Sequence, residues 1–482
     1  MFDGRYLRRR WWFPPPSLVS PRAVIFAFAL FGRVFATEAV PVGIPVGAVW
    51  AGSPVSFALL THAGRQFVAY YDGERRLTLA ARVLPSAQWI TVHPEGVWND
   101  VRKRPSSVTG WDSHNFLRLA VDRDGCLHLS GNMHVDPLVY YRTKKPLDIT
   151  SLERLDRMTG EREARCTYPV FFKNAAGDLL FRYRDGASGN GSDLYNIYDT
   201  ATRTWRRVLD QPVLEGEGQR NAYALDPVLG PDGRFHLVWM WRDTPDCATN
   251  NTLSYARSRD FLHWENSRGE PIALPITITR AEIIDAAKPH EGLINMTFNL
   301  GFDAAQKPVV VYHRYDAAGH SQAYIARPAS DAKTAATGWR VQPLSTWKFK
   351  WAFSGGGSIP AEVTLGAPRL GADGIFTVDF STTHAGAGAG RWRVREDTLE
   401  RVAEVPPLPP ALPVSLQRIE SSYPGLEVQS LVSRYEGRRY VLRWETMPRN
   451  RDLPRESAPP PTALQMYELP DAEESSATRV GS

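Results

Sequence analysis

The sequence predicts an all-β protein, a seven-bladed β-propeller, and three observations support this fold class. One pattern recurs after residue 45: an apolar strand, a turn with Asp or Asn and Gly, a second apolar strand, and then an aromatic-rich strand that ends near Trp. Turns of this kind between alternating strands are a strong β-hairpin signal. They recur about every 50 to 70 residues, which suits a blade of four strands. No long segment shows the apolar period of a helix.

Seven such units follow one another, from a first unit near residues 47–105 to a last unit near residues 414–468. Five clear turns lie at residues 124–125, 174–177, 232–233, 303–306 and 373–374. We therefore expect a single propeller domain over residues 45–468, although a length of 482 residues alone would suggest two or three domains. Residues 469–482 are acidic and rich in Ser, which predicts a disordered tail.

The first 36 residues have the layout of a secretory signal peptide. A basic run, Arg8 to Arg10, precedes an apolar stretch from Ala23 to Phe31 and a small-residue cleavage site ending at Ala36. The apolar stretch is too short to span a bilayer comfortably. We therefore expect residues 1–36 to be removed and the mature protein to be periplasmic or secreted, without a membrane span; the alternatives are a single-pass anchor and a misassigned start.

Composition excludes two further classes of protein. The formal net charge is only +5, and after the N-terminus no basic run is interleaved with aromatic residues, so a nucleic-acid partner is not expected. The three cysteines, Cys126, Cys166 and Cys247, are too few for a disulfide framework. We expect a monomer, and the mild positive charge would suit an anionic substrate.

Four candidate catalytic residues flank two consecutive predicted hairpins. His114 and His134 flank the first hairpin, and Tyr168 and Arg184 flank the second. Loops from several blades meet at one end of a propeller channel, so both pairs are expected at one mouth of adjacent blades. Any one of these residues alone would be a strand cap that hydrogen-bonds loop backbone. Together, with Arg184 leading into the glycine-rich segment 185–191, they favour a catalytic site.

These residue types fit β-elimination next to a uronic acid. The sugar carboxylate must be neutralised before the adjacent C5 proton can leave, because charge develops on the carboxylate in the transition state. Arg and His can supply that neutralisation. A Tyr near a cation can abstract the C5 proton and return a proton to the departing oxygen.

Two sets of motifs carry a resemblance to a known family. Ser258, Asp260 and Trp264 resemble the Ser-x-Asp-x-x-x-Trp form of the bacterial neuraminidase repeat, without its middle glycine. Residues 183–191 and 239–250 resemble the propeller polysaccharide lyases of that repeat group, such as ulvan lyases and rhamnosyl-glucuronate lyases. The resemblance covers residues 110 to 360.

The resemblance implies a lyase acting on an acidic polysaccharide or oligosaccharide, with a rhamnose-containing substrate. Carried over position by position, it implies that His114, His134, Tyr168 and Arg184 are catalytic. Which histidine neutralises the carboxylate stays open. We also expect Asn115, Gly189 and Asn190 to bind substrate, since glycines allow backbone to lie close to a ligand.

A metal site is a second expectation. The resemblance implies a structural zinc or calcium ion, with no cofactor required for catalysis. Cys247, His290 and His313 are residue types that zinc accepts. Relatives often carry His four positions after the cysteine, where this chain has Asn251. The alternative is a buried thiol and two loop histidines.

Two other functions stay open on sequence grounds. A glycoside hydrolase of sialidase-like architecture needs an acidic pair near the reacting carbon. Asp112, Asp185, Glu215 and Glu217 lie nearby in the sequence without forming a convincing pair. The third possibility is a non-catalytic propeller that only binds carbohydrate.

Overall fold

The computed structural model describes residues 41–329, 337–408 and 412–471. The predicted signal peptide, residues 1–36, lies outside the described residues, as do residues 472–482 of the predicted tail. Within the described ranges the regular structure is strand, apart from three single 3-10 turns, η1 (Ile149–Ser151), η2 (Cys247–Thr249) and η4 (Val414–Gln417). No helix in these ranges is long and apolar enough to cross a bilayer. The predicted all-β class is confirmed.

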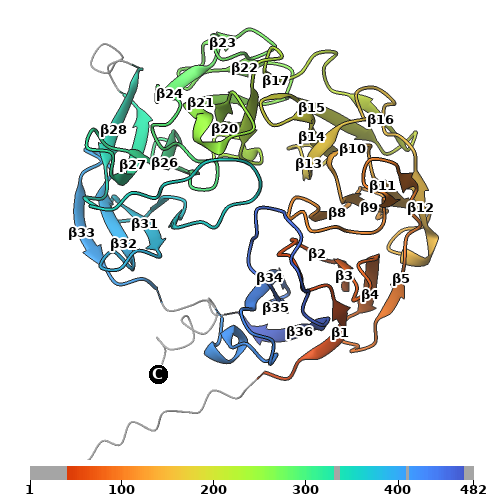
Figure 1. Ribbon diagram of the computed structural model, residues 1–482. Helices are drawn as coiled ribbons and strands as arrows, with labels where there is room; N and C mark the ends of the chain where they lie inside the picture. Colours follow the sequence, from red (N-terminus) through yellow and green to blue (C-terminus); the bar gives the residue numbers. More distant parts are fainter. Residues whose placement is uncertain (1–40, 330–336, 409–411, 472–482) are drawn as a thin grey trace, which may run out of the picture. The chain divides into compact units, whose positions relative to one another are not determined.

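In the described part of the chain, seven sheets of four to seven strands follow one another around a common centre (Figure 1). Sheet 1 contains β2 (Ala58–His62), β3 (Arg65–Tyr71), β4 (Leu77–Val83) and β5 (Ile90–Val92). Sheet 2 contains β8 (Leu117–Val121), β9 (Leu127–Gly131), β11 (Tyr140–Thr143) and β12 (Leu152–Leu155). Sheet 3 contains β10 (His134–Asp136), β13 (Cys166–Lys173), β14 (Leu179–Ala187), β15 (Asn190–Asp199), β16 (Thr204–Arg207) and β17 (Leu214–Glu215).

The remaining sheets complete the circuit. Sheet 4 contains β18 (Asn221–Ala224), β19 (Val228–Leu229), β20 (Phe235–Arg242), β21 (Asn250–Ser258), β22 (Trp264–Glu265), β23 (Pro271–Ile272) and β24 (Glu282–Asp285). Sheet 5 contains β25 (Asn299–Phe302), β26 (Pro308–Tyr315), β27 (Ser321–Pro328) and β28 (Trp339–Pro343). Sheet 6 contains β29 (Val363–Leu365), β30 (Arg369–Leu370), β31 (Ile375–Thr382), β32 (Ala389–Arg395) and β33 (Arg401–Val405). Sheet 7 contains β1 (Ile44–Val49), β34 (Glu427–Tyr435), β35 (Arg438–Thr446) and β36 (Thr462–Pro470). A short ribbon pairs β6 (Trp98–Asn99) with β7 (Arg104–Pro105).

Sheet 7 joins the two ends of the described chain. Strand β1 pairs antiparallel with β36, from Ile44 opposite Met466 to Val49 opposite Thr462. The first strand therefore completes the sheet formed by the last three. Strand β1 thereby pairs the backbone donors and acceptors along one side of β36 and itself becomes an edge strand of sheet 7.

The predicted Asp-Gly turns form as the sequence pattern requires. Between β8 and β9 the Asp122 carboxylate accepts hydrogen bonds from the backbone N–H groups of Asp124 and Cys126, while Gly125 has a φ of 81°. A left-handed turn position of this kind suits glycine, which has no Cβ. The turn between β25 and β26 lacks glycine, and there Gln306 takes the left-handed position with a φ of 62°.

The neuraminidase-like motif also folds into its turn without the middle glycine. The Asp260 carboxylate accepts hydrogen bonds from the backbone N–H groups of Leu262 and His263, both at 2.8 Å. Phe261 supplies the left-handed position with a φ of 62°. Trp264 closes the turn as a core residue with 2% of its surface exposed.

The core lies between adjacent sheets. Trp239 and Trp241 are fully buried in a cluster that joins sheets 3 and 4, so they are packing residues and not sugar platforms. The three cysteines are free and buried, so no disulfide holds the fold. In Figure 1 strands β2, β8 and β34 lie nearest the common centre and β5, β12 and β33 lie at the periphery. Side chains at the starts of the inner strands can therefore meet at one end.

Candidate active site

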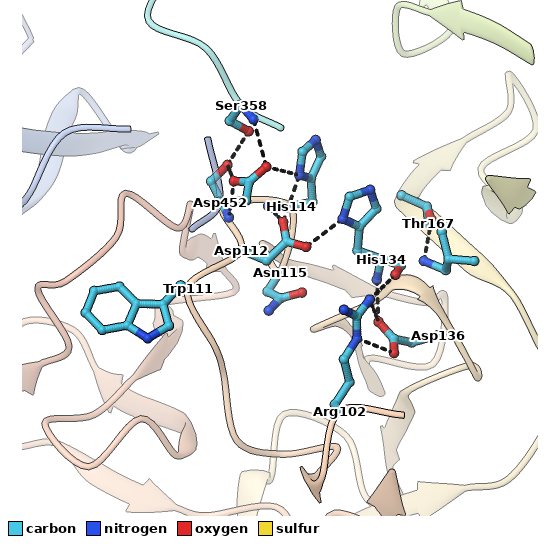
Figure 2. Close-up of polar contacts among 12 residues, drawn as sticks. Arg102, Trp111, Asp112, His114, Asn115, His134, Asp136, Thr167, Ser358 and Asp452 are labelled. Atoms are coloured by element: carbon cyan, nitrogen blue, oxygen red, sulfur yellow. Dashed lines mark hydrogen bonds and ion pairs between the residues drawn. The ribbon is translucent and has the colours of Figure 1, made fainter. Parts of the chain in front are cut away.

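One carboxylate holds the two predicted histidines side by side (Figure 2). Asp112 places its Oδ1 2.8 Å from His114 Nδ1 and its Oδ2 2.6 Å from His134 Nδ1. The two imidazole rings stack with centroids 4.1 Å apart. His114 precedes β8 in sheet 2 and His134 begins β10 in sheet 3, so the bridge joins neighbouring sheets. On sequence grounds Asp112 is only a candidate hydrolase carboxylate, and its bridging position is not predicted.

A second carboxylate reaches His114 from a distant part of the chain. Asp452, in the loop between β35 and β36, places Oδ2 3.3 Å from His114 Nδ1 (Figure 2). Its oxygens also accept hydrogen bonds from the backbone N–H groups of Ser113 at 3.0 Å and Ser358 at 2.7 Å. Loops of sheets 2, 6 and 7 therefore converge on this histidine. No local motif marks Asp452, so sequence reasoning missed it.

These contacts separate the charge states of the two histidines. Burial opposes ionisation of Asp112, but the hydrogen bonds from His114 and His134 outweigh it and hold the pKa of this carboxyl well below its usual range. Burial also disfavours the imidazolium of His114, yet Asp112 and Asp452 raise its pKa to about 9. Burial lowers the pKa of His134, and the charges on His114 and Arg184 lower it further against the opposing effect of Asp112. At neutral pH His114 is therefore charged and His134 is neutral.

A β-bulge directs His134 toward this bridge. Val135 has a φ of 63° and the β10–β13 register shifts between His134 and Asp136. The Asp136 carboxylate accepts a hydrogen bond from the backbone N–H of His134 at 2.8 Å and pairs with Arg102 (Figure 2). Arg102 also donates to the His134 carbonyl. Bulges re-aim side chains next to active sites, and here both backbone groups of His134, its N–H and its C=O, are hydrogen-bonded.

Tyr168 lies at a second bulge, on β13. It has a left-handed φ of 58°, and the β13–β14 register shifts between Thr167 and Val170. For a residue other than glycine this conformation costs about 1–2 kcal/mol, and such strain is typical of functional positions. Its ring lies 5.7 Å from the His114 ring, centroid to centroid. Burial and the neighbouring Tyr223 raise the pKa of Tyr168 well above its usual range, against the effect of Arg184.

Arg184 is a buried cation without a partner. Only 2% of its surface is exposed, and its three guanidinium nitrogens have no hydrogen-bond partner among the described residues. Its Cζ lies 4.9 Å from the centroid of the Tyr168 ring. Its neighbour on the same face, Arg182, is instead paired with Asp193 at 2.5 Å. An unpaired buried cation is costly, and of these two arginines Arg184 is the one whose donors are unused.

Tyr223 on β18 completes the cluster, and sequence reasoning missed it. Its hydroxyl lies 2.9 Å from Ser188 Oγ and accepts a hydrogen bond from Arg242 Nη1 at 3.0 Å. Its ring lies 6.0 Å from that of Tyr168. Although burial disfavours the phenolate, Arg242 and Arg184 outweigh it and lower the pKa of Tyr223 to about 8. Tyr223 follows no motif that would mark it in the sequence.

The residues expected to bind substrate fall into two groups. Asn115 is 2% exposed and its side-chain amide donates to Thr109 at 3.4 Å, so its contacts are internal. Gly189, with a φ of 80°, lies in the β14–β15 turn, and its N–H donates to Asn221 at 2.6 Å. Asn190 is exposed beside it at the start of β15. The glycine-rich segment thus reaches the site through Ser188 and Tyr223.

The expected metal ligands do not converge. His290 is exposed, while Cys247 and His313 are buried, and these three do not form a group with closely spaced ligand atoms. His313 Nδ1 lies 2.7 Å from the Gly292 carbonyl oxygen, and burial lowers the pKa of His313 to about 4. Burial raises the pKa of the Cys247 thiol, which disfavours the thiolate that zinc binds. These residues do not fit a zinc site as they lie here.

Within the described ranges, the one group of His, Cys, Asp or Glu whose ligand atoms lie within 4.8 Å of one another is Asp112, His114 and His134. Two of its contacts, at 2.8 and 2.6 Å, have the length of hydrogen bonds between ring nitrogen and carboxylate. Proton sharing therefore accounts for this geometry without an ion.

The fold and the cluster together define a class: an all-β repeat protein with a buried, unpaired arginine beside two tyrosines and a carboxylate-bridged histidine pair. The chain belongs to the BNR repeat-containing family, whose match covers residues 65–347. The family accounts for the neuraminidase-like turn at Asp260.

Solved structures of two lyases share the fold. Polysaccharide lyase Uly1 is 16% identical with a TM-score of 0.54, and the match covers 87% of this chain and 91% of that one. An ulvan lyase of a new polysaccharide lyase family, PL25, bound to -[GlcA(1-4)Rha3S]-, is 13% identical with a TM-score of 0.56, covering 90% and 96%.

Curated relatives match over a shorter stretch. The long isoform of ulvan lyase from Alteromonas sp. (strain LOR) is 29% identical over 134 residues, which is 25% of this chain and 13% of the relative. That from Pseudoalteromonas sp. (strain PLSV) is 29% identical over 122 residues, or 23% and 12%. The matched region therefore spans only a small part of these relatives' own length.

Proposed function

We propose that this protein is a polysaccharide lyase that cleaves by β-elimination next to a uronic acid in an acidic, rhamnose-containing polysaccharide such as ulvan. The activity of the curated relatives and the sugar bound to the PL25 ulvan lyase support the substrate class. The observation that carries the proposal is Arg184, a buried guanidinium with three unpartnered nitrogens beside Tyr168. A guanidinium with free N–H groups can donate two parallel hydrogen bonds to the two oxygens of a planar carboxylate.

In this proposal Arg184 binds the uronate carboxylate and, with the charged His114, stabilises the negative charge that develops as C5 loses its proton. Donors held in a buried site do this better than water, because they are already oriented before the reaction. Asp112 and Asp452 keep His114 protonated, and their hydrogen bonds fix its ring.

The proton transfers fall to His134 and Tyr168. His134 is neutral, and because its Nδ1 hydrogen-bonds to Asp112, its Nε2 is free to take the C5 proton. Tyr168, whose pKa is raised, keeps its phenolic proton at neutral pH and can give it to the glycosidic oxygen as the C4–O bond breaks. The electron pair of the C5–H bond becomes the C4=C5 double bond. The double role expected for Tyr168 is thus divided between two residues.

The product tests this proposal directly. Elimination yields an unsaturated uronate that absorbs in the ultraviolet, so incubation with ulvan should raise the absorbance as chains shorten. A hydrolase would yield saturated reducing ends, and a binding module would yield no product. Of the carboxylates considered for hydrolysis, Asp185 pairs with Arg162 at 2.8 Å and Glu215 accepts from Ser192 at 2.9 Å. Saturated products would overturn the lyase assignment.

The same proposal covers the number of propeller blades, the export of the protein and its oligomeric state. Seven sheets around a common centre, with β1 and β36 pairing the two ends of the described chain in sheet 7, support a closed, seven-bladed propeller over residues 45–468, with strand continuing to Pro470. Residues 1–36 would direct export to the periplasm or medium and then be removed, because an enzyme acting on a polymer must meet it outside the cell. We also propose that the protein acts as a monomer. Sedimentation of the exported protein tests that state.

A further inference from the structure

A short ribbon outside the seven sheets reaches into the candidate active site. Its strands β6 and β7 lie in the segment between β5 and β8 and form a two-stranded sheet of their own. The ribbon exposes 57% of Trp98 and 82% of Val101, so these side chains add little to the core. Arg102, in the turn between the two strands, points instead toward Asp136 and His134 (Figure 2). The proposed mechanism assigns no role to this arginine.

Arg102 binds both oxygens of one buried carboxylate. Its Nε lies 2.8 Å from Asp136 Oδ1, and its Nη2 lies 3.0 Å from Asp136 Oδ2. The Asp136 side chain is only 5% exposed, so the carboxylate is shielded from water. Asn99 supports both partners, because its Oδ1 accepts a hydrogen bond from the Arg102 backbone N–H at 3.0 Å and its Nδ2 donates to Asp136 Oδ1 at 2.9 Å. A bidentate pair of this kind fixes the geometry of its two partners.

The same ion pair holds the backbone of His134 at both of its polar groups. Asp136 Oδ2 accepts a hydrogen bond from the His134 N–H at 2.8 Å, and Arg102 Nη2 donates to the His134 carbonyl. The next residue, Val135, is β-branched and has a left-handed φ of 63°, which makes it a conformational outlier. Its N–H donates to Thr167 Oγ1 at 2.8 Å. A strained backbone persists only where its surroundings fix it, so these hydrogen bonds determine where the imidazole lies.

We propose that Arg102 is a positioning residue for His134: it holds the histidine through its carbonyl and through Asp136, and it neutralises the Asp136 carboxylate. This role rests on the proposed function, in which neutral His134 takes the C5 proton. A misplacement of about 1 Å can cost about 100-fold in rate. An unneutralised carboxylate next to the histidine would also favour the imidazolium, which cannot accept a proton.

Charged and titratable groups from five segments surround His134. Burial lowers the pKa of His134, and the charges of His114 and Arg184 lower it further against the effect of Asp112. In the parent protein the charge of Asp136 is matched by Arg102, so Arg102→Gln leaves one more negative charge beside the histidine. The groups are Asp112 and His114 ahead of β8, Arg102 and Arg104 of the ribbon, Asp136 on β10, Tyr168 on β13 and Arg184 on β14.

The experiment measures kcat, KM and the acid limb of the pH–rate profile on ulvan. Arg102→Gln should lower kcat about 10- to 100-fold, keep KM within about threefold and move the acid limb up by about one pH unit. Arg102→Lys keeps the charge but lacks the paired donors of the guanidinium, so its acid limb should stay in place while kcat recovers only in part. The double variant Arg102→Gln with Asp136→Asn removes both charges and should return the limb to its parent position.

Arg391→Gln is the matched control. Arg391 on β32 of sheet 6 also binds both oxygens of one carboxylate, with its Nε 2.5 Å from Asp379 Oδ1 and its Nη2 3.0 Å from Asp379 Oδ2. Its replacement should leave kcat and the acid limb unchanged. The proposal is wrong if Arg102→Gln lowers only the temperature of unfolding and, where the variant stays folded, keeps the parent kcat and acid limb. Arg102 would then only anchor the ribbon.

An NMR titration of the His134 ring tests the inference without turnover. The signal of this ring is identified by its loss in His134→Gln. A higher His134 pKa in Arg102→Gln that returns in the double variant supports the inference. If the parent protein gave no unsaturated product, that result would overturn only the proposed lyase. Unsaturated product together with an unmoved His134 pKa in Arg102→Gln would overturn the inference and keep the lyase.

Discussion

Arg184 and Arg182 point to the same face of β14, yet the structure predicts opposite consequences of replacing them. We consider Arg184→Met and Arg182→Met, which remove the charge and keep most of the volume. Arg182 forms a buried pair with Asp193, whose side chain is 2% exposed. Breaking a buried pair from one side leaves an uncompensated charge and costs about 3–5 kcal/mol. Arg182→Met should therefore lower the free energy of unfolding by that amount.

Arg184→Met removes a buried cation that has no hydrogen-bond partner, so its effect on stability should be small or favourable. Its effect on catalysis should be large. Truncating one partner of a buried, hydrogen-bonded charge pair costs about 2–5 kcal/mol, which at 1.36 kcal/mol per factor of ten is about a 30- to 5,000-fold loss of kcat/KM on a uronate substrate.

The two measurements are thermal or denaturant unfolding and the ultraviolet rate of elimination on ulvan. Arg184→Met should unfold at the parent temperature or above it and be nearly inactive. Arg182→Met should unfold earlier and keep activity within about tenfold at a temperature where it stays folded. The activity of Arg184→Lys should fall between that of the parent and that of Arg184→Met, because lysine keeps the positive charge but lacks the paired N–H donors of the guanidinium. Equal losses of stability and activity in both methionine variants would refute the distinction between the two arginines.

Four further outcomes are expected. Tyr168→Phe should lower kcat about 10²–10⁴-fold while oligosaccharide binding, followed by calorimetry, survives; near-normal turnover would make the tyrosine a structural residue. The rate should rise with pH as His134 loses its proton and fall above about pH 9 as His114 loses its own. Asp112→Asn should move that alkaline limb to lower pH, because it removes a charge that raises the pKa of His114; an unmoved limb in the pH–rate profile would exclude His114 as its source. N-terminal sequencing of exported protein should begin just after Ala36, and material beginning at Met1 would contradict removal of a signal peptide.

Much of the fold was accessible from the sequence because β-hairpins are local. The Asp-Gly turn at Gly125 is specified by residues within five positions of one another, since Asp122 bonds to Asp124 and Cys126. Periodic turns then predict the number of units. The exception at Gln306 is instructive, because the hydrogen bond from its N–H to the Asp303 carbonyl closes the turn although the left-handed residue is not glycine.

The candidate site was accessible only in part. Arg184 sits beside a glycine-rich turn, and Gly191 leaves room for its stem, since a Cβ there would lie 3.0 Å from Arg184 Cδ. That juxtaposition is local. Asp452 and Tyr223 approach from sheets 7 and 4, and their roles arise from contacts with His114 and Arg242 that no spacing in the sequence reveals. Likewise Cys247 and His313 have atoms that could bind a metal, but both side chains are buried and His313 Nδ1 contacts a backbone carbonyl. The sequence reveals neither fact.

The distribution of charge in the site follows from which carboxylates already have a hydrogen-bond or ion-pair partner. Asp112 is shared by both histidines, Asp193 pairs with Arg182, and neither reaches Arg184 at hydrogen-bonding distance. A sequence selected only for stability would neutralise that last buried cation, because an unpaired charge in the interior is unfavourable. Arg184 is instead left with aromatic rings for neighbours, which stabilise a guanidinium by only about 1–2 kcal/mol. In the proposed function the remaining cost is recovered when the substrate carboxylate binds, so stability and substrate affinity should change in opposite directions at this position.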